Sequence, residues 1–166
     1  MKKTALVALL VAVSGVVLIG ISAIARAPLL VWNASASAPI GLYRVTTGAP
    51  ERGDLVLISP PKSIAKLAAE RRYLPLGVPL IKRIAAMGGD DVCLFDGAII
   101  INGEIAARLL ERDHTGRPMP RWDECHTLTD DEIFLLTSPQ DSFDSRYFGP
   151  VPRAQIIGRL APLWTE

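Results

Sequence analysis

Two serines and a lysine are the residues of this chain whose types could perform acyl transfer together. Ser35 and Ser37 lie in the sequence "SASAP", and Lys82 lies in a later apolar run, "VPLIKRIAAM". A serine hydroxyl is a weak nucleophile that needs a base within hydrogen-bond reach. A buried lysine can be that base, although lowering its pKa from about 10.4 to near 7.5 takes roughly 4 kcal/mol of differential destabilisation of the ammonium. Residue types alone favour the ordinary alternatives, a turn of small residues and a surface lysine.

A second group of candidate residues lies in "SFDSRYFGPVP", residues 142–152. Asp144 and Arg146 can form an ion pair there, and the Ser142 hydroxyl could orient an amine. The two histidines, His114 and His126, have no motif around them, and the sequence has no G-x-S-x-G elbow. A Ser-His-Asp triad therefore has little support.

Strands must position these groups. Residues 52–59, "RGDLVLIS", and Val78–Met87 each indicate a strand, because both are rich in apolar β-forming residues and are bounded by turn residues. Alternation along the second strand places Lys82 on the apolar face and Arg83 on the opposite face. The residues expected to share the face of Lys82 are Leu80, Ile84 and Ala86.

The remaining segments predict a mainly β domain with one or two short helices. The helix is expected at residues 62–73, "KSIAKLAAERRY". Short strands are expected between residues 91 and 107, with hairpin turns at Asp96-Gly97 and Asn102-Gly103. "EIFLLT", residues 132–137, predicts a further strand, whereas residues 109–129 are polar and aperiodic. We expect residues from about 94 to 130 to form a small loop-rich β insertion.

Cys93 and Cys125 are the only cysteines of the chain. In an exported domain they could form one disulfide. A zinc site with His114 and His126 is less favoured because the usual CxxC and HxxxH spacings are absent, and two unpaired thiols are the simplest alternative. We expect no metal and no cofactor.

An uncharged run from Ala5 to Ala25 predicts a single transmembrane anchor. At about 1.5 Å per residue the run spans roughly 30 Å as a helix, the thickness of a bilayer's hydrocarbon core. Lys2 and Lys3 precede it, so the positive-inside rule places the N-terminus in the cytoplasm. A cleaved signal peptide ending in "SAIA" is the competing interpretation, but the run is long for one. We expect an anchor in residues 1–26, an extracytoplasmic domain in residues 27–166 and contact with membrane lipid.

The balanced charge of the chain, a formal +1, argues against nucleic-acid binding.

Taken in order, "SASAP", "RGD", "KRIAAMGGD" and "SFDSRYFG" resemble the sequence boxes of type I signal peptidases, which are membrane-anchored Ser/Lys endopeptidases. The resemblance implies that Ser37 is the nucleophile, Lys82 the general base and Ser35 an oxyanion-hole hydroxyl. It also implies that Ser142 orients Lys82 and that Asp144 and Arg146 form a supporting ion pair. The expected fold is the antiparallel β catalytic domain of these enzymes.

Three departures separate this chain from the housekeeping enzymes of that family. Those enzymes usually have Ser-Met and a further residue before proline, whereas here Ser37 is followed by Ala38 and then immediately by Pro39. In addition, "LTS" at residues 136–138 replaces Gly-Asp-Asn, and Ala86 replaces a glycine. The version "SxPxGLYR" with "SFDSRYFGP" looks instead like the TraF-type branch, whose members mature the pilin of conjugative transfer systems. That resemblance implies an exported pilin precursor as the substrate, possible cyclisation of the product, and other conjugation components as partners. A general signal peptidase and a non-catalytic membrane-tethered β module remain the alternatives.

Overall fold

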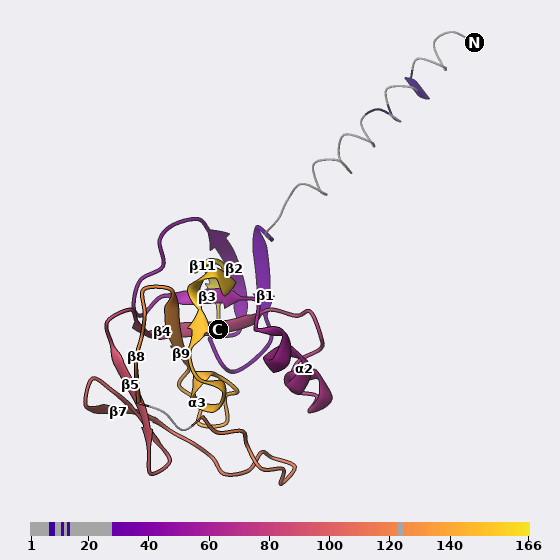
Figure 1. Cartoon of the computed structure of the whole chain (residues 1–166). Coiled ribbons are helices and arrows are strands. Elements are labelled where there is room, and N and C mark those ends of the chain that lie inside the picture. The colour runs from indigo at the N-terminus through magenta and orange to yellow at the C-terminus, as the bar shows by residue number, and fades with distance from the viewer. Residues whose placement is uncertain (1–6, 9–10, 12, 14–27, 123–124) are drawn as a thin grey trace.

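Two antiparallel sheets and short helices make up the domain (Figure 1). The computed structural model describes residues 7, 8, 11, 13, 28–122 and 125–166. Its strands are β1 (Leu30–Asn33), β2 (Gly41–Thr46), β3 (Leu55–Ile58), β4 (Leu80–Met87), β5 (Asp91–Phe95), β6 (Ala98–Ile101), β7 (Glu104–Arg108), β8 (Cys125–Thr127), β9 (Glu132–Leu136), β10 (Val151–Pro152) and β11 (Ile156–Thr165). The helices are α2 (Lys62–Glu70), α3 (Ser145–Phe148) and a 3₁₀ turn at Arg153–Gln155. The expectation of a mainly β domain with short helices is confirmed.

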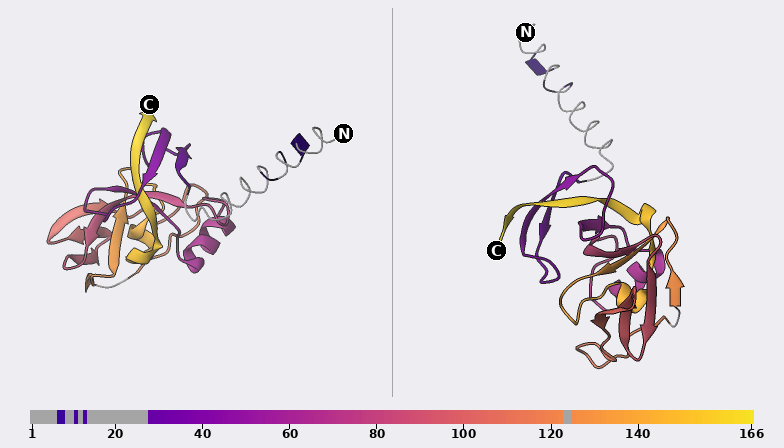
Figure 2. Two further views of the ribbon diagram at one scale, coloured as in Figure 1. Left: turned by 90° about the horizontal axis from the view of Figure 1, so that it is seen from above. Right: turned by 90° about the vertical axis from the view of Figure 1, so that its left-hand side faces the viewer.

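The larger sheet has the strand order β1-β2-β11-β3-β4-β9-β10. Strand β4 therefore lies between β3 and β9, with buried side chains on both of its faces. Strand β11 is the longest and runs along β2 to the C-terminus (Figure 2). The smaller sheet has the order β7-β6-β5-β8.

Apolar side chains cover both faces of the larger sheet near β4 and β9. One face buries Val56, Ile58, Ile84, Ile133, Leu135 and Val151. The other face packs against the smaller sheet and buries Ala86, Val92, Ile99, Leu128, Phe134 and Leu136. The two cores hold β4 and β9 from both sides, so they fix the strand that carries Lys82 and the start of the loop that carries Ser142.

The sequence prediction for β4 was right about Lys82 and wrong about Ala86. Lys82 is buried and Arg83 is exposed, as alternation requires. The pairing with β9 shifts register between Ile84 and Ala86. This irregularity rotates the strand, so Ala86 packs in the opposite core from Ile84.

The smaller sheet contains the two hairpin turns that the sequence predicts. Asp96 and Gly97 have φ of 47° and 69°, and Asn102 and Gly103 have φ of 50° and 85°. Positive φ at both central residues is what a two-residue hairpin turn with the right twist requires, and Asp-Gly and Asn-Gly adopt it at low cost. The short strand β8 lies within the segment that the sequence indicates to be loop.

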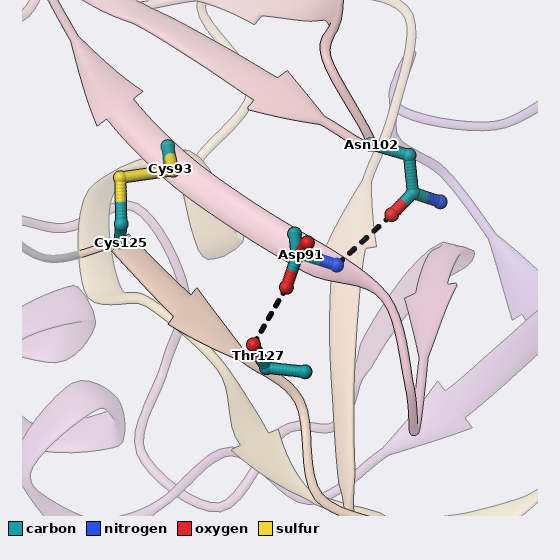
Figure 3. Close-up of a disulfide and its surroundings, with 5 residues drawn as sticks. All are labelled: Asp91, Cys93, Asn102, Cys125 and Thr127. Atoms are coloured by element: carbon teal, nitrogen blue, oxygen red, sulfur yellow. Dashed lines mark hydrogen bonds between the residues drawn. A yellow bond between two sulfur atoms is a disulfide. The ribbon is translucent and has the colours of Figure 1, made fainter.

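A disulfide joins Cys93 on β5 to Cys125 on β8 (Figure 3). The two residues are direct partners across the strand pair, with Cα atoms 4.1 Å apart. On the same strand, Asp91 accepts a hydrogen bond from the Thr127 hydroxyl and donates its backbone N–H to Asn102 Oδ1 (Figure 3). Strand β8 is thus tied to β5 at both of its ends.

The membrane anchor expected at Ala5–Ala25 falls almost wholly outside the described residues. Within the described part of the chain, no helix has the length and apolar character needed to cross a membrane. The division into an anchor and a peptidase domain stays a prediction.

Candidate active site

The loop between β1 and β2 carries the two serines, and Asn33 organises it. Asn33 ends β1 and is buried. Its Nδ2 donates to the carbonyls of Ser35, Ala38 and Pro39 at 2.9, 2.9 and 3.0 Å. Its Oδ1 accepts from the Ser35 backbone N–H at 3.0 Å and from the Ser35 hydroxyl at 2.9 Å. One buried amide therefore fixes the backbone on both sides of Ser37.

Ser35 and Ser37 lie side by side in this loop. Their hydroxyl oxygens are 2.8 Å apart and either can donate to the other. Ser37 is half-buried and Ser35 is exposed. Since a serine has one hydroxyl hydrogen and Asn33 Oδ1 can only accept, a Ser35 hydroxyl that donates to Asn33 must accept from Ser37.

Lys82 projects from β4 into a buried polar site. It is 3% exposed, and its Nζ donates to Ser142 Oγ at 2.6 Å and to Thr137 Oγ1 at 3.4 Å. Burial lowers the pKa of Lys82 from 10.5 to about 8; the Asp144 and Asp141 carboxylates oppose this shift, and Arg146 adds to it. The amine is thus neutral in an appreciable fraction of molecules near neutral pH.

Behind Lys82, Asp144 and Arg146 form a buried ion pair. Arg146 Nε and Nη2 donate to Asp144 Oδ1 and Oδ2 at 2.7 and 3.0 Å, and both side chains are almost fully buried. Asp144 also caps helix α3 by accepting the Arg146 backbone N–H. Arg146 Nη2 donates further to the Thr137 carbonyl at 2.6 Å. This two-pronged geometry holds the loop 137–146 against the end of β9.

Ser35, Ser37, Lys82 and Ser142 all line one cavity of about 450 Å³. Among the described residues, the hydrogen bonds of Lys82 Nζ go to Ser142 and Thr137 and not to Ser37. Catalytic hydrogen bonds are often long before substrate binds, so the shared cavity is the relevant observation. Four of the six candidate residues therefore line this cavity. The other two, Asp144 and Arg146, support the loop that carries Ser142, so the structure brings all six into one region.

Ser37 also lines a second, larger cavity of about 760 Å³. Its walls come from the serine loop, strands β4 and β7 and the loop after β9, and several wall residues are small: Ala36, Ala38, Ala85, Ala106 and Ala107. Ser37, Ala36 and Pro139 line both cavities. Ser37 thus lies where the two cavities meet.

Two other sequence boxes have a structural role. Arg52 of "RGD" pairs with Asp90 of "GGD", with Nη2 2.6 Å from Oδ2. Asp90 also accepts from the Met87 backbone N–H and from Asn102 Nδ2. Burial acts to raise the pKa of Asp90, but the hydrogen bonds from Arg52, Asn102 and Met87 outweigh it and lower this pKa. Neither Arg52 nor Asp90 is among the described residues that line the two cavities. This cluster joins the start of β3 to the turn after β4.

Sequence reasoning missed Asn33 and Thr137. The signal for Asn33 was a single amide at the end of the apolar run "LLVW", where a buried polar group must find hydrogen-bond partners. Thr137 ends the predicted strand "EIFLLT", and only the folded loop shows its hydroxyl beside Lys82 and Ser142.

No cluster of three or more His, Cys, Asp or Glu among the described residues could hold a metal ion. The zinc alternative is not supported for a further reason, since both cysteine sulfurs are in the disulfide. His126 Nε2 instead lies 2.7 Å from Glu132 Oε2.

Comparisons with known proteins extend over nearly the whole chain. The family model described as "Signal peptidase, peptidase S26" matches residues 2–164. A plasmid transfer protein TraF of Escherichia coli is 36% identical over 80% of this chain and 81% of its own length. A probable conjugal transfer protein TraF of Sinorhizobium fredii is 37% identical over 76% of this chain and 72% of its own. A signal peptidase I of Leptolyngbya laminosa is 29% identical over 66% of this chain and 50% of its own.

Proposed function

Because this chain belongs to the signal peptidase family, peptidase S26, we propose that it is a membrane-anchored serine endopeptidase with a Ser37/Lys82 dyad. The observation that carries the proposal is the desolvated Lys82 amine, oriented by Ser142 in the cavity that it shares with Ser37. Burying a lysine costs free energy of folding, and a role as the base of a nearby serine accounts for that cost.

In the first step, Ser37 Oγ attacks the scissile carbonyl carbon while neutral Lys82 takes the hydroxyl proton. The negative charge that develops on the carbonyl oxygen is stabilised by the Ser37 backbone N–H and the Ser35 hydroxyl. For these transfers, the Ser35 hydrogen must turn away from Asn33 Oδ1, and the Ser37 hydrogen must turn from Ser35 toward Lys82. Lys82 then returns the proton to the leaving amine, and the acyl chain stays on Ser37.

In the second step, a water molecule loses a proton to Lys82 and attacks the acyl carbon, and Lys82 returns that proton to Ser37 Oγ as the acyl bond to Ser37 breaks. A free amino terminus of the substrate could replace water and give a cyclic product. The two cavities suit these reaction steps, because Lys82 is among the described residues that line the smaller cavity and not among those that line the larger one. We place the leaving amine and the attacking water, which exchange protons with Lys82, in the smaller cavity, and the acyl side of the substrate in the larger one.

The proposed substrate is an exported pilin precursor of a conjugative transfer system. The two TraF relatives given above are named for plasmid or conjugal transfer, and they cover more of this chain than the signal peptidase I relative does. The small wall residues of the larger cavity suit an extended peptide lying along the wall formed by β7. Other conjugation components are the expected partners.

Co-expression with candidate pilin precursors tests this proposal, with intact product mass as the measurement. Wild-type chain should process one precursor, and Ser37→Ala should leave it full length. A product one water lighter than the linear fragment would identify cyclisation. Processing that persists in Ser37→Ala would contradict the serine mechanism.

A general signal peptidase is the second candidate, and the match to the Leptolyngbya enzyme favours it. It predicts that the chain restores growth to a strain depleted of its own leader peptidase. The alternative of a non-catalytic module predicts instead that cells with the Ser37→Ala variant transfer the plasmid as efficiently as cells with the wild-type chain.

A further inference from the structure

The Thr137 hydroxyl lies at the centre of the polar contacts around Lys82. Thr137 follows β9 and is 8% exposed. Its Oγ1 is 2.6 Å from Ser142 Oγ, 3.3 Å from Asp144 Oδ2 and 3.4 Å from Lys82 Nζ. Its backbone N–H donates to the same Asp144 oxygen at 3.1 Å. The backbone hydrogen bond to Asp144 thus holds the Thr137 hydroxyl in contact with Lys82, Ser142 and Asp144.

Hydrogen-bond capacity gives these contacts a direction. The Asp144 carboxylate only accepts, so Thr137 donates its single hydrogen to it and accepts from its other neighbours. Ser142 must then donate to Thr137, which turns the lone pairs of Ser142 toward Lys82. The chain of donors runs from Lys82 through Ser142 and Thr137 to Asp144.

The same contacts fix the direction of the lysine nitrogen. Nζ has four tetrahedral positions, of which one is its bond to Cε and two point at Ser142 and Thr137. One position remains, and it carries the lone pair when the amine is neutral. With a single acceptor, two positions would remain, and the lone pair could occupy either of them.

We infer that Thr137 is a positioning residue of the proposed dyad, which together with Ser142 fixes the free position of Lys82 Nζ and links Ser142 to Asp144. The inference rests on the proposed function and adds a residue to it. The charged groups that act on Lys82 are Asp144, Asp141 and Arg146. A substitution at Thr137 keeps all three charges, and Thr137→Val removes only the hydroxyl with its hydrogen bonds to Lys82, Ser142 and Asp144.

Thr137→Val and Thr137→Ser form a matched pair for the test. The first keeps the shape of the side chain and removes the hydroxyl; the second keeps the hydroxyl and removes the methyl group. We expect Thr137→Val to lower the plateau of kcat/KM about 10- to 100-fold, part of the 10²–10⁴-fold that general-base catalysis contributes. The acidic limb of the pH profile should move to lower pH, because the ammonium loses an acceptor. Thr137→Ser should stay close to wild type in both respects.

A readout that does not need turnover separates this inference from the proposed function. The chain has five lysines, Lys2, Lys3, Lys62, Lys66 and Lys82. The titration of Lys82 can therefore be followed by NMR of ¹³C-labelled lysine in the whole chain, with Lys82→Arg to assign its signal. The pKa of Lys82 should fall in Thr137→Val and not in Thr137→Ser, whether or not a substrate has been found.

The outcomes are distinct. An unchanged Lys82 titration and pH profile in Thr137→Val would overturn the inference, as would equal defects in both variants, which would assign the effect to packing of the methyl group. If Thr137→Val does not fold, Thr137→Ala is read in the same way against Thr137→Ser. Absence of turnover in wild type, together with the expected titrations, would count against the proposed function alone.

Discussion

At the scale of single residues, the site depends on an amine taken out of water. Lys82 is 3% exposed, and its two hydrogen-bond acceptors are neutral hydroxyls. The carboxylate that acts most strongly on Lys82, Asp144, has both oxygens engaged by Arg146, which reduces the support that it gives to an ammonium. Desolvation therefore outweighs the carboxylates and lowers the pKa of Lys82 to about 8.

The pH dependence of cleavage should follow this group. Only neutral Lys82 can accept the Ser37 proton, so kcat/KM should rise with pH and level off above about pH 8. Lys82→Arg should abolish turnover although it keeps the positive charge, because a guanidinium does not deprotonate in proteins. Turnover in that variant, or a rate that does not depend on pH below 8, would contradict the assignment of Lys82.

Lys82→Met should make the protein more stable while removing its activity. The pKa is about 8 in the folded chain, below its ordinary 10.5. The unfolded chain therefore binds the proton more tightly, and the folded state is penalised by up to about 3 kcal/mol below pH 8, at 1.36 kcal/mol per pKa unit. The penalty shrinks between pH 8 and 10.5 and vanishes above that range. Urea unfolding of both proteins at pH 7 and pH 10.5 measures it, and a variant no more stable at pH 7 would count against a desolvated lysine.

Several residues of the candidate site could be predicted from the sequence, and others could not. Lys82, Ser142, Asp144 and Arg146 were identified because their boxes keep a recognisable order. Asn33 and Thr137 have ordinary surroundings in sequence, and their importance comes from contacts made by the folded loops. Buried hydrogen-bond networks of this kind combine residues from separate segments, so spacing does not show them.

At the scale of secondary structure, local signals predicted the hairpins of the smaller sheet well and several strands of the larger sheet less well. Asp-Gly and Asn-Gly set the turns of the smaller sheet by backbone preference alone. Strands β1, β2 and β11 were not predicted. Strand β11 contains Gly158 and Pro162, which interrupt a strand pattern, and its pairing shifts register after Pro162. The shift in β4 at Ala85 likewise depends on the partner strand.

The disulfide should stabilise the smaller sheet and leave the serine loop unaffected. Cys93 and Cys125 are 32 residues apart, and closing such a loop contributes about 3–4 kcal/mol in the chain-entropy model. The double variant Cys93→Ala/Cys125→Ala should therefore unfold at lower denaturant concentration. Neither cysteine lines the cavities among the described residues, so kcat/KM in the folded range should stay within about 2-fold of wild type, as expected for a surface change away from the site. Equal stability of the reduced and oxidised chains would contradict this account.

At the scale of the whole molecule, the proposed substrate and the predicted anchor require a domain that lies close to a membrane. Strand β1 begins only a few residues after the predicted span, and Trp32 on it stacks on Trp164 at the end of β11, with ring centroids 5.7 Å apart. Both rings are about half exposed, and Leu29, Leu30 and Leu163 are exposed around them. Tryptophan is enriched at membrane–water interfaces, and exposed leucines beside it suit the same position.

The anchor can be tested by extraction. The whole chain should stay with the membrane pellet in alkaline carbonate, whereas a chain that begins at residue 28 should be released, because the uncharged run is lost. Protease added to the periplasmic side should degrade the domain. Release of the whole chain by carbonate would contradict the anchor, and protection of the domain would contradict its predicted orientation.

The most direct test of the central claim is the chemical identity of the acyl-enzyme. The chain is mixed with an intact precursor that it is known to cleave, quenched in acid after a short time and digested. The mass of the peptide that contains Ser37 is then measured. We predict that this peptide carries the acyl part of the substrate in wild type and is unmodified in Ser37→Ala, which should not cleave. Cleavage with no adduct on Ser37, or an adduct on another residue that persists in Ser37→Ala, would contradict the Ser37/Lys82 dyad.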